Sequence, residues 1–170
     1  MERLAGRPGP LTLDDPELRL TDAPSEELRT VAGDGLVAFN TELLGSSNRR
    51  PLGIAIHCRK DGKLLGGLYG RTGFRRLFVE LLFVPEALRG RGLGARLLQQ
   101  AEAEARARDC VGAWLDTFSA EAMRFYLKNG YRVFGEIADY PPGNTRFFLS
   151  KDFCAAGAST LASAPSRSGG

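Results

Sequence analysis

Residues 84–110 have the sequence VPEALRGRGLGARLLQQAEAEARARDC and change character in the middle. They pass from an apolar, strand-like end through closely spaced glycines into a charged, helix-like tail. The apolar positions after the glycines recur at helical spacing: Leu93, Leu97, Leu98 and Ala101. Glu102 with Arg106, and Glu104 with Arg108, are ion pairs at i,i+4 spacing on the other face. The pattern therefore predicts a strand, a glycine turn and an amphipathic helix that begins at the glycines.

A glycine turn between a strand and a helix start is suited to binding an anion. The unpaired N–H groups and the positive dipole end of the helix point at the ligand, and glycine lets it approach the backbone. Arg89 and Arg91 would add charge and bidentate phosphate contacts. The loop lacks the Lys-Ser/Thr ending of a P-loop, and its glycine spacing is not that of dinucleotide-binding folds. Taken alone, the glycines could equally serve the turn, with both arginines solvated.

Strand-like and helix-like runs alternate along the rest of the chain and predict a mixed α/β sheet. Ser25 is a candidate helix N-cap, and Gly33 and Gly35 are expected to divide the helix that follows into two pieces. A further helix is expected over residues 119–129, after the helix that begins at the glycines. Strands are predicted for residues 17–24, 51–59, 63–72, 76–84, 111–118, 131–137 and 145–151.

Composition indicates one globular domain over residues 17–153, with loose Gly-, Ala-, Ser- and Pro-rich tails over 1–16 and 154–170. No apolar run approaches the roughly 20 residues that cross a membrane, so a cytoplasmic protein without membrane contact is expected. The net charge of +3 is too balanced to predict a nucleic-acid partner. Three scattered cysteines and a single histidine predict no metal site and no disulfide framework.

Two motifs in this order carry a family resemblance. Residues 84–98 resemble the signature of the GNAT superfamily of acetyl-CoA-dependent N-acetyltransferases, Arg/Gln-x-x-Gly-x-Gly/Ala after the fourth strand, with Arg89, Gly92 and Gly94 in place. Residues 119–137, SAEAMRFYLKNGYRVFGEI, resemble the second signature of that family, with Ala122, Tyr126, Gly130 and Tyr131 in place. The resemblance covers roughly residues 18–151. It implies the GNAT fold, a mixed, mostly antiparallel sheet of about seven strands flanked by helices and splayed at the fourth and fifth strands.

The resemblance also implies acetyl-CoA as cofactor and places its contacts. The pyrophosphate is expected at Arg89, Gly90, Arg91, Gly92, Leu93 and Gly94. The pantetheine arm is expected to pair with the backbone of Leu82, Phe83 and Val84. Ser119 stands where many relatives have an Asn that contacts this arm. A serine there caps the next helix equally well, so both roles stay open.

Two residues are expected to carry the chemistry. Tyr126 matches the family tyrosine near the cofactor sulfur, where a phenol could donate a proton or a hydrogen bond to the departing thiolate. Glu80 is a carboxylate in the apolar run of residues 76–84 and matches a position where relatives carry a catalytic or water-positioning Glu. The alternatives are a packing role for Tyr126 and, for Glu80, a structural ion pair with Arg71 or Arg75.

The acceptor side is expected to be formed by the first helix region, a middle strand and the last hairpin. In the family that the sequence resembles, these segments shape the acceptor side, which nominates Phe39, Asn40, Tyr69, Asp139 and Tyr140. Asp116, at the carboxyl end of the strand predicted for residues 111–118, could contact the amine or merely cap the next helix. Three carboxylates, Glu80, Asp116 and Asp139, could together attract a cationic amine if they lie close to one another. Loop or core packing is the alternative for each.

The sequence thus predicts an enzyme that transfers an acetyl group to a primary amine of a small molecule by direct attack in a ternary complex. A homodimer is a further expectation, because dimers are common among such proteins. The alternatives are a non-catalytic acyl-CoA-binding regulatory module, and an acyltransferase that acts on a protein or uses another acyl donor.

Overall fold

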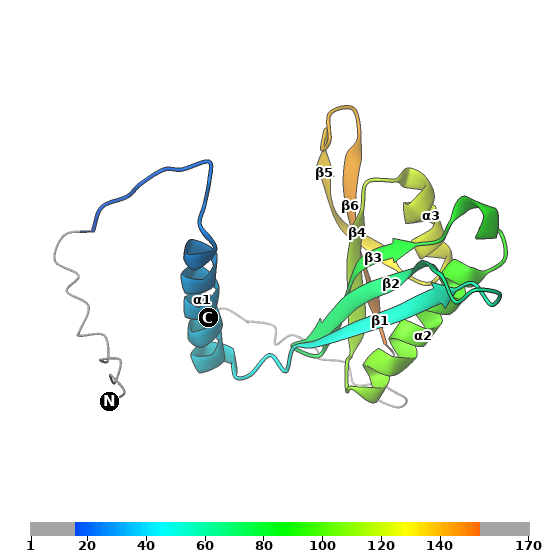
Figure 1. The fold of residues 1–170 in the computed structure, drawn as a ribbon, viewed down its shortest axis with the longest axis horizontal. Coiled ribbons are helices and arrows are strands. Elements are labelled where there is room, and N and C mark those ends of the chain that lie inside the picture. The colour runs from blue at the N-terminus through cyan, green and yellow to red at the C-terminus, as the bar shows by residue number, and fades with distance from the viewer. Residues whose placement is uncertain (1–15, 154–170) are drawn as a thin grey trace, which may run out of the picture. The chain divides into compact units, whose positions relative to one another are not determined.

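The helix predicted after the glycines forms as α2, Leu93–Ala107, in the computed structural model, which describes residues 16–153 (Figure 1). The predicted tails lie outside the described residues, apart from Pro16. The other helices are α1 (Glu26–Leu44), the short 3-10 helix η1 (Glu86–Leu88) and α3 (Ala120–Lys128). The strands are β1 (Arg50–His57), β2 (Leu64–Gly73), β3 (Arg76–Phe83), β4 (Gly112–Thr117), β5 (Arg132–Ala138) and β6 (Thr145–Asp152).

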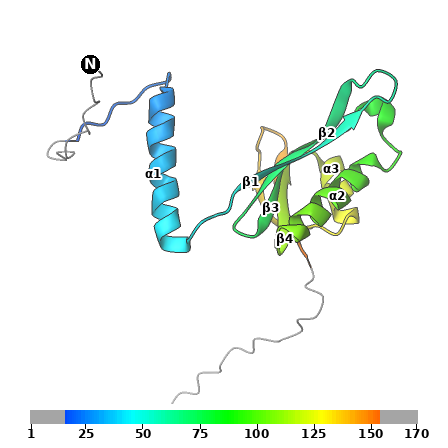
Figure 2. The same ribbon diagram turned by 60° about the horizontal axis from the view of Figure 1, so that its bottom comes forward.

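The six strands form one mixed sheet in the order β1-β2-β3-β4-β6-β5. Only β3 and β4 run parallel, because α2 connects them as a crossover, and the other neighbours are antiparallel. Helices α2 and α3 lie on the same side of the sheet (Figure 2). The hydrophobic core lies between the sheet and these helices, and its largest fully buried side chains are Leu77, Leu98, Leu115 and Leu149.

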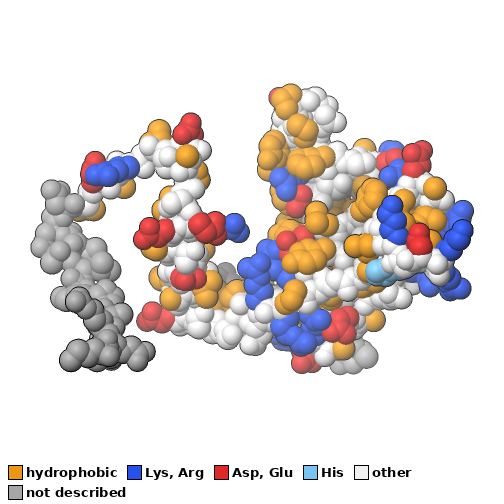
Figure 3. All heavy atoms as spheres, in the orientation of Figure 1, with side chains coloured by type: hydrophobic (Ala, Val, Ile, Leu, Met, Phe, Trp, Pro, Cys, Tyr) orange, Lys and Arg blue, Asp and Glu red, His pale blue; other side chains and the backbone are white. Residues whose placement is uncertain are grey.

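The opposite face of the sheet, which we call the open face, carries the side chains that alternate along each strand with the core residues. On neighbouring strands Phe78 and Trp114 stack there, with ring centroids 3.9 Å apart. Figure 3 shows hydrophobic side chains interspersed with Lys and Arg on the surface of the sheet unit. The open face is thus both aromatic and charged.

Strands β3 and β4 separate toward their carboxyl ends. Their pairing runs from Arg76 opposite Gly112 to Val79 opposite Leu115 and stops there. Glu80 is the next residue on β3, and it is an extra residue in a β-bulge, because Val79 pairs with Gly70 and Leu81 with Tyr69. The predicted splay is confirmed, although the strands concerned are the third and fourth of the sheet.

Two details of the predicted elements were wrong. Residues 17–24 form no strand, so the sheet has six strands. Leu18 and Leu20 are fully exposed, and an alternating pattern without a partner strand does not suffice to build one. The first helical region is one continuous helix, α1, instead of two, and Ser25 caps it as predicted, because its Oγ accepts the Leu28 N–H at 3.1 Å.

Within the part of the chain that the structure describes, residues 16–43 and 44–153 belong to two separate compact units. The first contains nearly all of α1, none of whose residues is buried, and the second contains the sheet with α2 and α3. The predicted single domain over residues 17–153 stays a prediction.

Candidate active site

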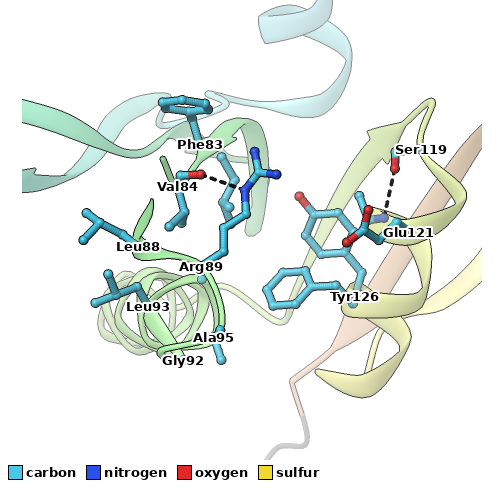
Figure 4. Close-up of a pocket in the computed structure, with 15 residues that line it drawn as sticks. Phe83, Val84, Leu88, Arg89, Gly92, Leu93, Ala95, Ser119, Glu121 and Tyr126 are labelled. Carbon is cyan, nitrogen blue, oxygen red and sulfur yellow. Dashed lines mark hydrogen bonds between the residues drawn. The ribbon is translucent and has the colours of Figure 1, made fainter. Parts of the chain in front are cut away.

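A cavity of about 480 Å³ opens where β3 and β4 separate (Figure 4). Its walls are the end of β3, the glycine loop, the first turn of α2, and α3. The lining residues are Leu82, Phe83, Val84, Leu88, Arg89, Gly90, Gly92, Leu93, Gly94, Ala95, Ser119, Glu121, Ala122, Phe125 and Tyr126. Every predicted cofactor residue is among them except Arg91, which is exposed.

The glycines of the loop have different structural roles. Gly92 is the N-cap of α2 with φ 71°, a left-handed conformation that side chains rarely adopt, and no side chain caps the helix start. The first N–H groups of α2 are therefore left for a ligand. At Gly94 a Cβ would lie 3.1 Å from Cζ of Phe125, so this glycine lets α3 pack closely against α2. The loop is thus both an anion cradle and a packing contact.

Arg89 lies across the opening of the cavity. Its Nε donates a hydrogen bond to the carbonyl oxygen of Val84 at 3.1 Å, at the end of β3 (Figure 4). Arg89 therefore adds positive charge between the predicted pantetheine site and the glycine loop. This charge, the free N–H groups of α2 and the unpaired end of β3 fit an extended anionic cofactor.

Helix α3 supplies the opposite wall. Ser119 is its N-cap, and its Oγ accepts the Ala122 N–H at 3.1 Å, so the capping role expected for this serine is present. About two helical turns after Ser119, Tyr126 is buried with its hydroxyl directed toward the gap (Figure 4). Burial, and then the neighbouring Asp116 carboxylate, raises the pKa of Tyr126 to about 12. The phenol is therefore protonated at neutral pH, so it can donate a hydrogen bond and does not act as a phenolate base.

Glu80 forms an ion pair with Arg71 of β2 on the open face, and its side chain is 28% exposed. The Arg71 guanidinium also lies over the Phe78 ring, 4.8 Å from its centroid, and this contact holds the guanidinium in position. The structural ion pair that the sequence left open for Glu80 is present. The residue nonetheless occupies the bulge at the point where the strands separate.

Asp116 is the corresponding carboxylate on β4 and pairs with Arg146 of β6. Nε and Nη2 of Arg146 lie 2.8 and 2.6 Å from the same oxygen, Oδ2 of Asp116. Asp139, the third predicted carboxylate, accepts the Gly143 N–H at 2.6 Å within the β5–β6 loop. All three acidic residues thus have partners, so they do not form a bare anionic cluster.

The remaining predicted acceptor residues fall into two groups. Tyr69 is half exposed on β2, and Tyr140 packs edge-to-face on Phe118 at 5.7 Å near Arg146, so both belong to the sheet unit. Phe39 and Asn40 belong to α1, in the separate first unit. The structure gives these two no place relative to the cavity.

Several residues of the site were missed. Leu88, Ala95, Glu121 and Phe125 line the cavity without having been nominated, and so does Ala122, which was named only as part of the second signature. Its helical spacing from Tyr126, four residues later, could have placed Ala122 in the site, whereas Phe125 becomes recognisable only from its contact with Gly94. Arg146 had no local signal, because its partner lies 30 residues away.

Within residues 16–153, no group of three or more His, Cys, Asp or Glu side chains is placed to hold a metal ion. In the same range no helix is long and apolar enough to span a membrane.

Comparison with known proteins places this cavity in context. Residues 19–131 match the Acetyltransferase (GNAT) family. An acetyltransferase of Agrobacterium fabrum is 40% identical over 134 residues, which are 79% of this chain and 97% of the relative. Blasticidin-S acetyltransferase of Streptomyces morookaense is 44% identical over 96 residues, 56% of this chain and 71% of the relative.

Solved structures agree. The crystal structure of a protein from Agrobacterium tumefaciens, described there as an acetyltransferase, has a TM-score of 0.77 at 39% identity and covers 81% of this chain and 99% of that chain. A Bacillus anthracis protein solved in complex with acetyl coenzyme A shares the fold, with a TM-score of 0.50 at 21% identity over 55% of this chain and 58% of that chain. The chain belongs to the GNAT family and is an acetyl-CoA-dependent acyltransferase.

Proposed function

We propose that this protein transfers the acetyl group of acetyl-CoA to a primary amine of a small molecule, by direct attack of the amine in a ternary complex. The observation that carries the proposal is the buried, protonated Tyr126, whose hydroxyl faces the gap between β3 and β4 in an otherwise cofactor-shaped cavity. A relative named for acetylation of blasticidin-S, a small molecule, supports the choice of acceptor size.

Residues of the cavity would hold the cofactor as follows. The N–H groups at the start of α2, with Arg89 and the backbone of Gly90 and Gly92, would bind its pyrophosphate. The backbone of residues 82–84, beyond the last β3–β4 pair, would bind its extended arm. Bound acetyl-CoA supplies an activated carbonyl and a thiolate leaving group. Ser119 would contribute mainly by capping α3, since its Oγ accepts the Ala122 N–H.

Two side chains of the protein would then assist the reaction, one by donating a hydrogen bond and one by accepting a proton. Tyr126 donates a hydrogen bond toward the sulfur that leaves. Glu80, held by Arg71 at the β3 bulge, accepts the proton that the amine loses, directly or through a water molecule. The bulge puts Glu80 at the separation point of the strands, next to the position where the acetyl group would arrive.

Two other functions would share the cavity. A regulatory module would bind acyl-CoA without turnover, but the Tyr126 hydroxyl, which is directed toward the gap, favours catalysis. The other alternative is an acyltransferase that uses a longer acyl donor or a protein acceptor. Such a donor or acceptor would need space beside Phe83, and this residue is 57% exposed. A cytoplasmic location and a homodimer stay predictions.

The test is thiol release from acetyl-CoA by the purified protein against a broad panel of amines, with coenzyme A binding measured in parallel by calorimetry. Turnover with one class of small amines would support the proposal and identify the class. Tight coenzyme A binding without turnover of any small amine would refute the small-molecule assignment and favour a regulatory module or a macromolecular acceptor.

A further inference from the structure

Four charged side chains lie on the open face across four adjacent strands. Arg71, Glu80, Asp116 and Arg146 belong to β2, β3, β4 and β6, which are consecutive in the sheet; we call them the charge row. The two carboxylates are central, where β3 and β4 separate, and each arginine lies one strand further out. A ligand above the separation point would therefore meet negative charge at the centre and positive charge beside it.

The Asp116–Arg146 half of the row keeps hydrogen-bonding groups free. Nε and Nη2 of Arg146 both contact one oxygen of Asp116, and Tyr140 is a further side-chain hydrogen-bond partner of the guanidinium. A guanidinium has five N–H donors, so some of them remain for a ligand. No described residue donates to Oδ1 of Asp116. The side chains are 27% and 17% exposed, so they are partly desolvated yet accessible. A molecule that carries both charges could pair with each partner without breaking the ion pair.

Aromatic rings surround this half of the row. The guanidinium of Arg146 lies 4.7 Å from the centroid of the Phe118 ring and 5.6 Å from those of Tyr140 and Phe148. Phe118 and Tyr140 are 45% and 46% exposed and meet edge-to-face. This aromatic wall is apolar surface next to a charged centre, which suits an acceptor with an apolar or aromatic group.

The orientation of a ligand follows from Tyr126. Asp116 is on β4 at the point where β3 and β4 separate, and the Tyr126 hydroxyl is directed toward this gap, whereas Arg146 is on β6, on the side of β4 away from the gap. An amine beside Asp116 would therefore be near the proton donor, and an anionic group would reach Arg146. Neighbouring strands are about 4.8 Å apart, which suits a nitrogen and a carboxylate separated by two or three bonds.

We propose that the acceptor is an amino acid with an apolar or aromatic side chain, whose carboxylate is bound by Arg146 and whose amine lies at Asp116. This rests on the acetyl transfer to a small amine proposed above and names its substrate class. The amine nitrogen bonds to the acetyl carbon, the carbon–sulfur bond breaks, and the proton that the amine loses passes by way of Glu80 to the released thiolate. The carboxylate makes and breaks no bond, so Arg146 determines specificity and takes no part in the chemistry.

The experiment compares two matched substrates, L-phenylalanine and L-phenylalaninamide, which differ in the carboxylate. We measure kcat/KM by thiol release for the wild type and for Arg146→Gln, Arg146→Lys and Arg132→Gln. Arg132 is a matched control, because it pairs with Asp152 at 2.8 Å on the same β5–β6 hairpin, away from the cavity. The ratio of variant to wild type for each substrate cancels the different basicity of the two amines.

We expect the wild type to prefer the acid, and Arg146→Gln to lower kcat/KM for the acid by roughly tenfold or more while the amide changes less than about threefold. Arg146→Lys should restore part of the preference for the acid, because lysine keeps the charge but lacks the forked N–H donors of arginine. Arg132→Gln should leave kcat/KM unchanged for both substrates. Equal use of acid and amide by the wild type, or an equal loss of both in Arg146→Gln, would overturn the proposal.

Other outcomes separate this inference from the function beneath it. Turnover of simple amines such as cadaverine, with none of L-phenylalanine, would refute the amino acid class and leave the acetyl transfer standing. Coenzyme A binding without turnover of any amine would refute both. If Arg146→Gln fails to fold, the preference of the wild type and the Arg146→Lys variant decide.

Discussion

Replacing Tyr126 by phenylalanine removes one hydroxyl from the cavity and keeps the ring. That ring packs edge-to-face on Phe125 and Tyr131, with centroids 5.2 and 5.8 Å away, so the variant should fold as the wild type does. Any loss of activity then reports on the hydroxyl.

The raised pKa decides what this hydroxyl can do. Burial, followed by the Asp116 carboxylate, raises the pKa of Tyr126 to about 12, whereas an ordinary thiol has a pKa of about 8.5. Complete proton transfer from the phenol to a thiolate would therefore be uphill by roughly 3.5 pKa units, or about 5 kcal/mol. Tyr126 should keep its proton and stabilise the developing charge on sulfur by a hydrogen bond.

One preorganised donor of this kind is worth about 10²–10³ in kcat. Tyr126→Phe should therefore lower kcat about 100-fold and leave the Kd for coenzyme A within about twofold. Thiol release at saturating substrates gives kcat, and calorimetry gives the Kd. Tyr131→Phe is the matched control, because Tyr131 is also a buried phenol but does not line the cavity, and it should keep kcat within about threefold.

The pH dependence of kcat is a second test of the role of the Tyr126 hydroxyl. The protonated phenol is the active form, and its proton is lost only as pH rises toward about 12, so no alkaline limb from Tyr126 should appear below about pH 11. A limb near pH 10 that vanishes in Tyr126→Phe would show that burial does not hold the proton. A kcat of the variant within threefold of the wild type would remove the hydroxyl from the mechanism altogether.

Three further substitutions test separate parts of the structure. Glu80→Gln should lower kcat and flatten the acidic limb of the pH–rate profile if this carboxylate is the base; an unchanged limb with altered stability would leave it a structural ion pair. Gly94→Ala places a Cβ 3.1 Å from the Phe125 ring and should weaken coenzyme A binding severalfold by moving α3 from α2, which calorimetry would detect. Lys151→Met removes the nearer ion-pair partner of the 5% exposed Glu102 carboxylate, at 2.7 Å, and leaves only Arg106 at 3.8 Å, which should cost about 3 kcal/mol in urea unfolding. A cost below about 1 kcal/mol would show that the Glu102 carboxylate does not depend on Lys151.

The elements with strong local patterns could be predicted from sequence. The apolar run of residues 76–84 gave β3, and the spacing after the glycines gave α2, because each pattern matches the geometry of its own element. The prediction of a broken helix failed at Gly33 and Gly35. A glycine costs only about 1 kcal/mol relative to alanine in a helix, which lowers stability without forcing a break.

The residues that line the cavity could be predicted from sequence and the partners of the acceptor-side carboxylates could not, for the same physical reason. The predicted cofactor residues lie in two continuous segments, residues 82–94 and 119–126, so motif spacing alone brings them together. The partners of Glu80 and Asp116 come from other strands, and the bulge at Glu80 shifts the register by one residue. No local pattern encodes such a shift.

The separation of β3 and β4 links these two halves of the site. Pairing stops at Val79 and Leu115, which frees the β3 backbone where we propose that the cofactor arm binds. The very next residues, Glu80 and Asp116, are the two central carboxylates of the charge row. Because both features arise at the same point of the sheet, the sheet itself fixes the distance between the proposed cofactor arm and the charge row.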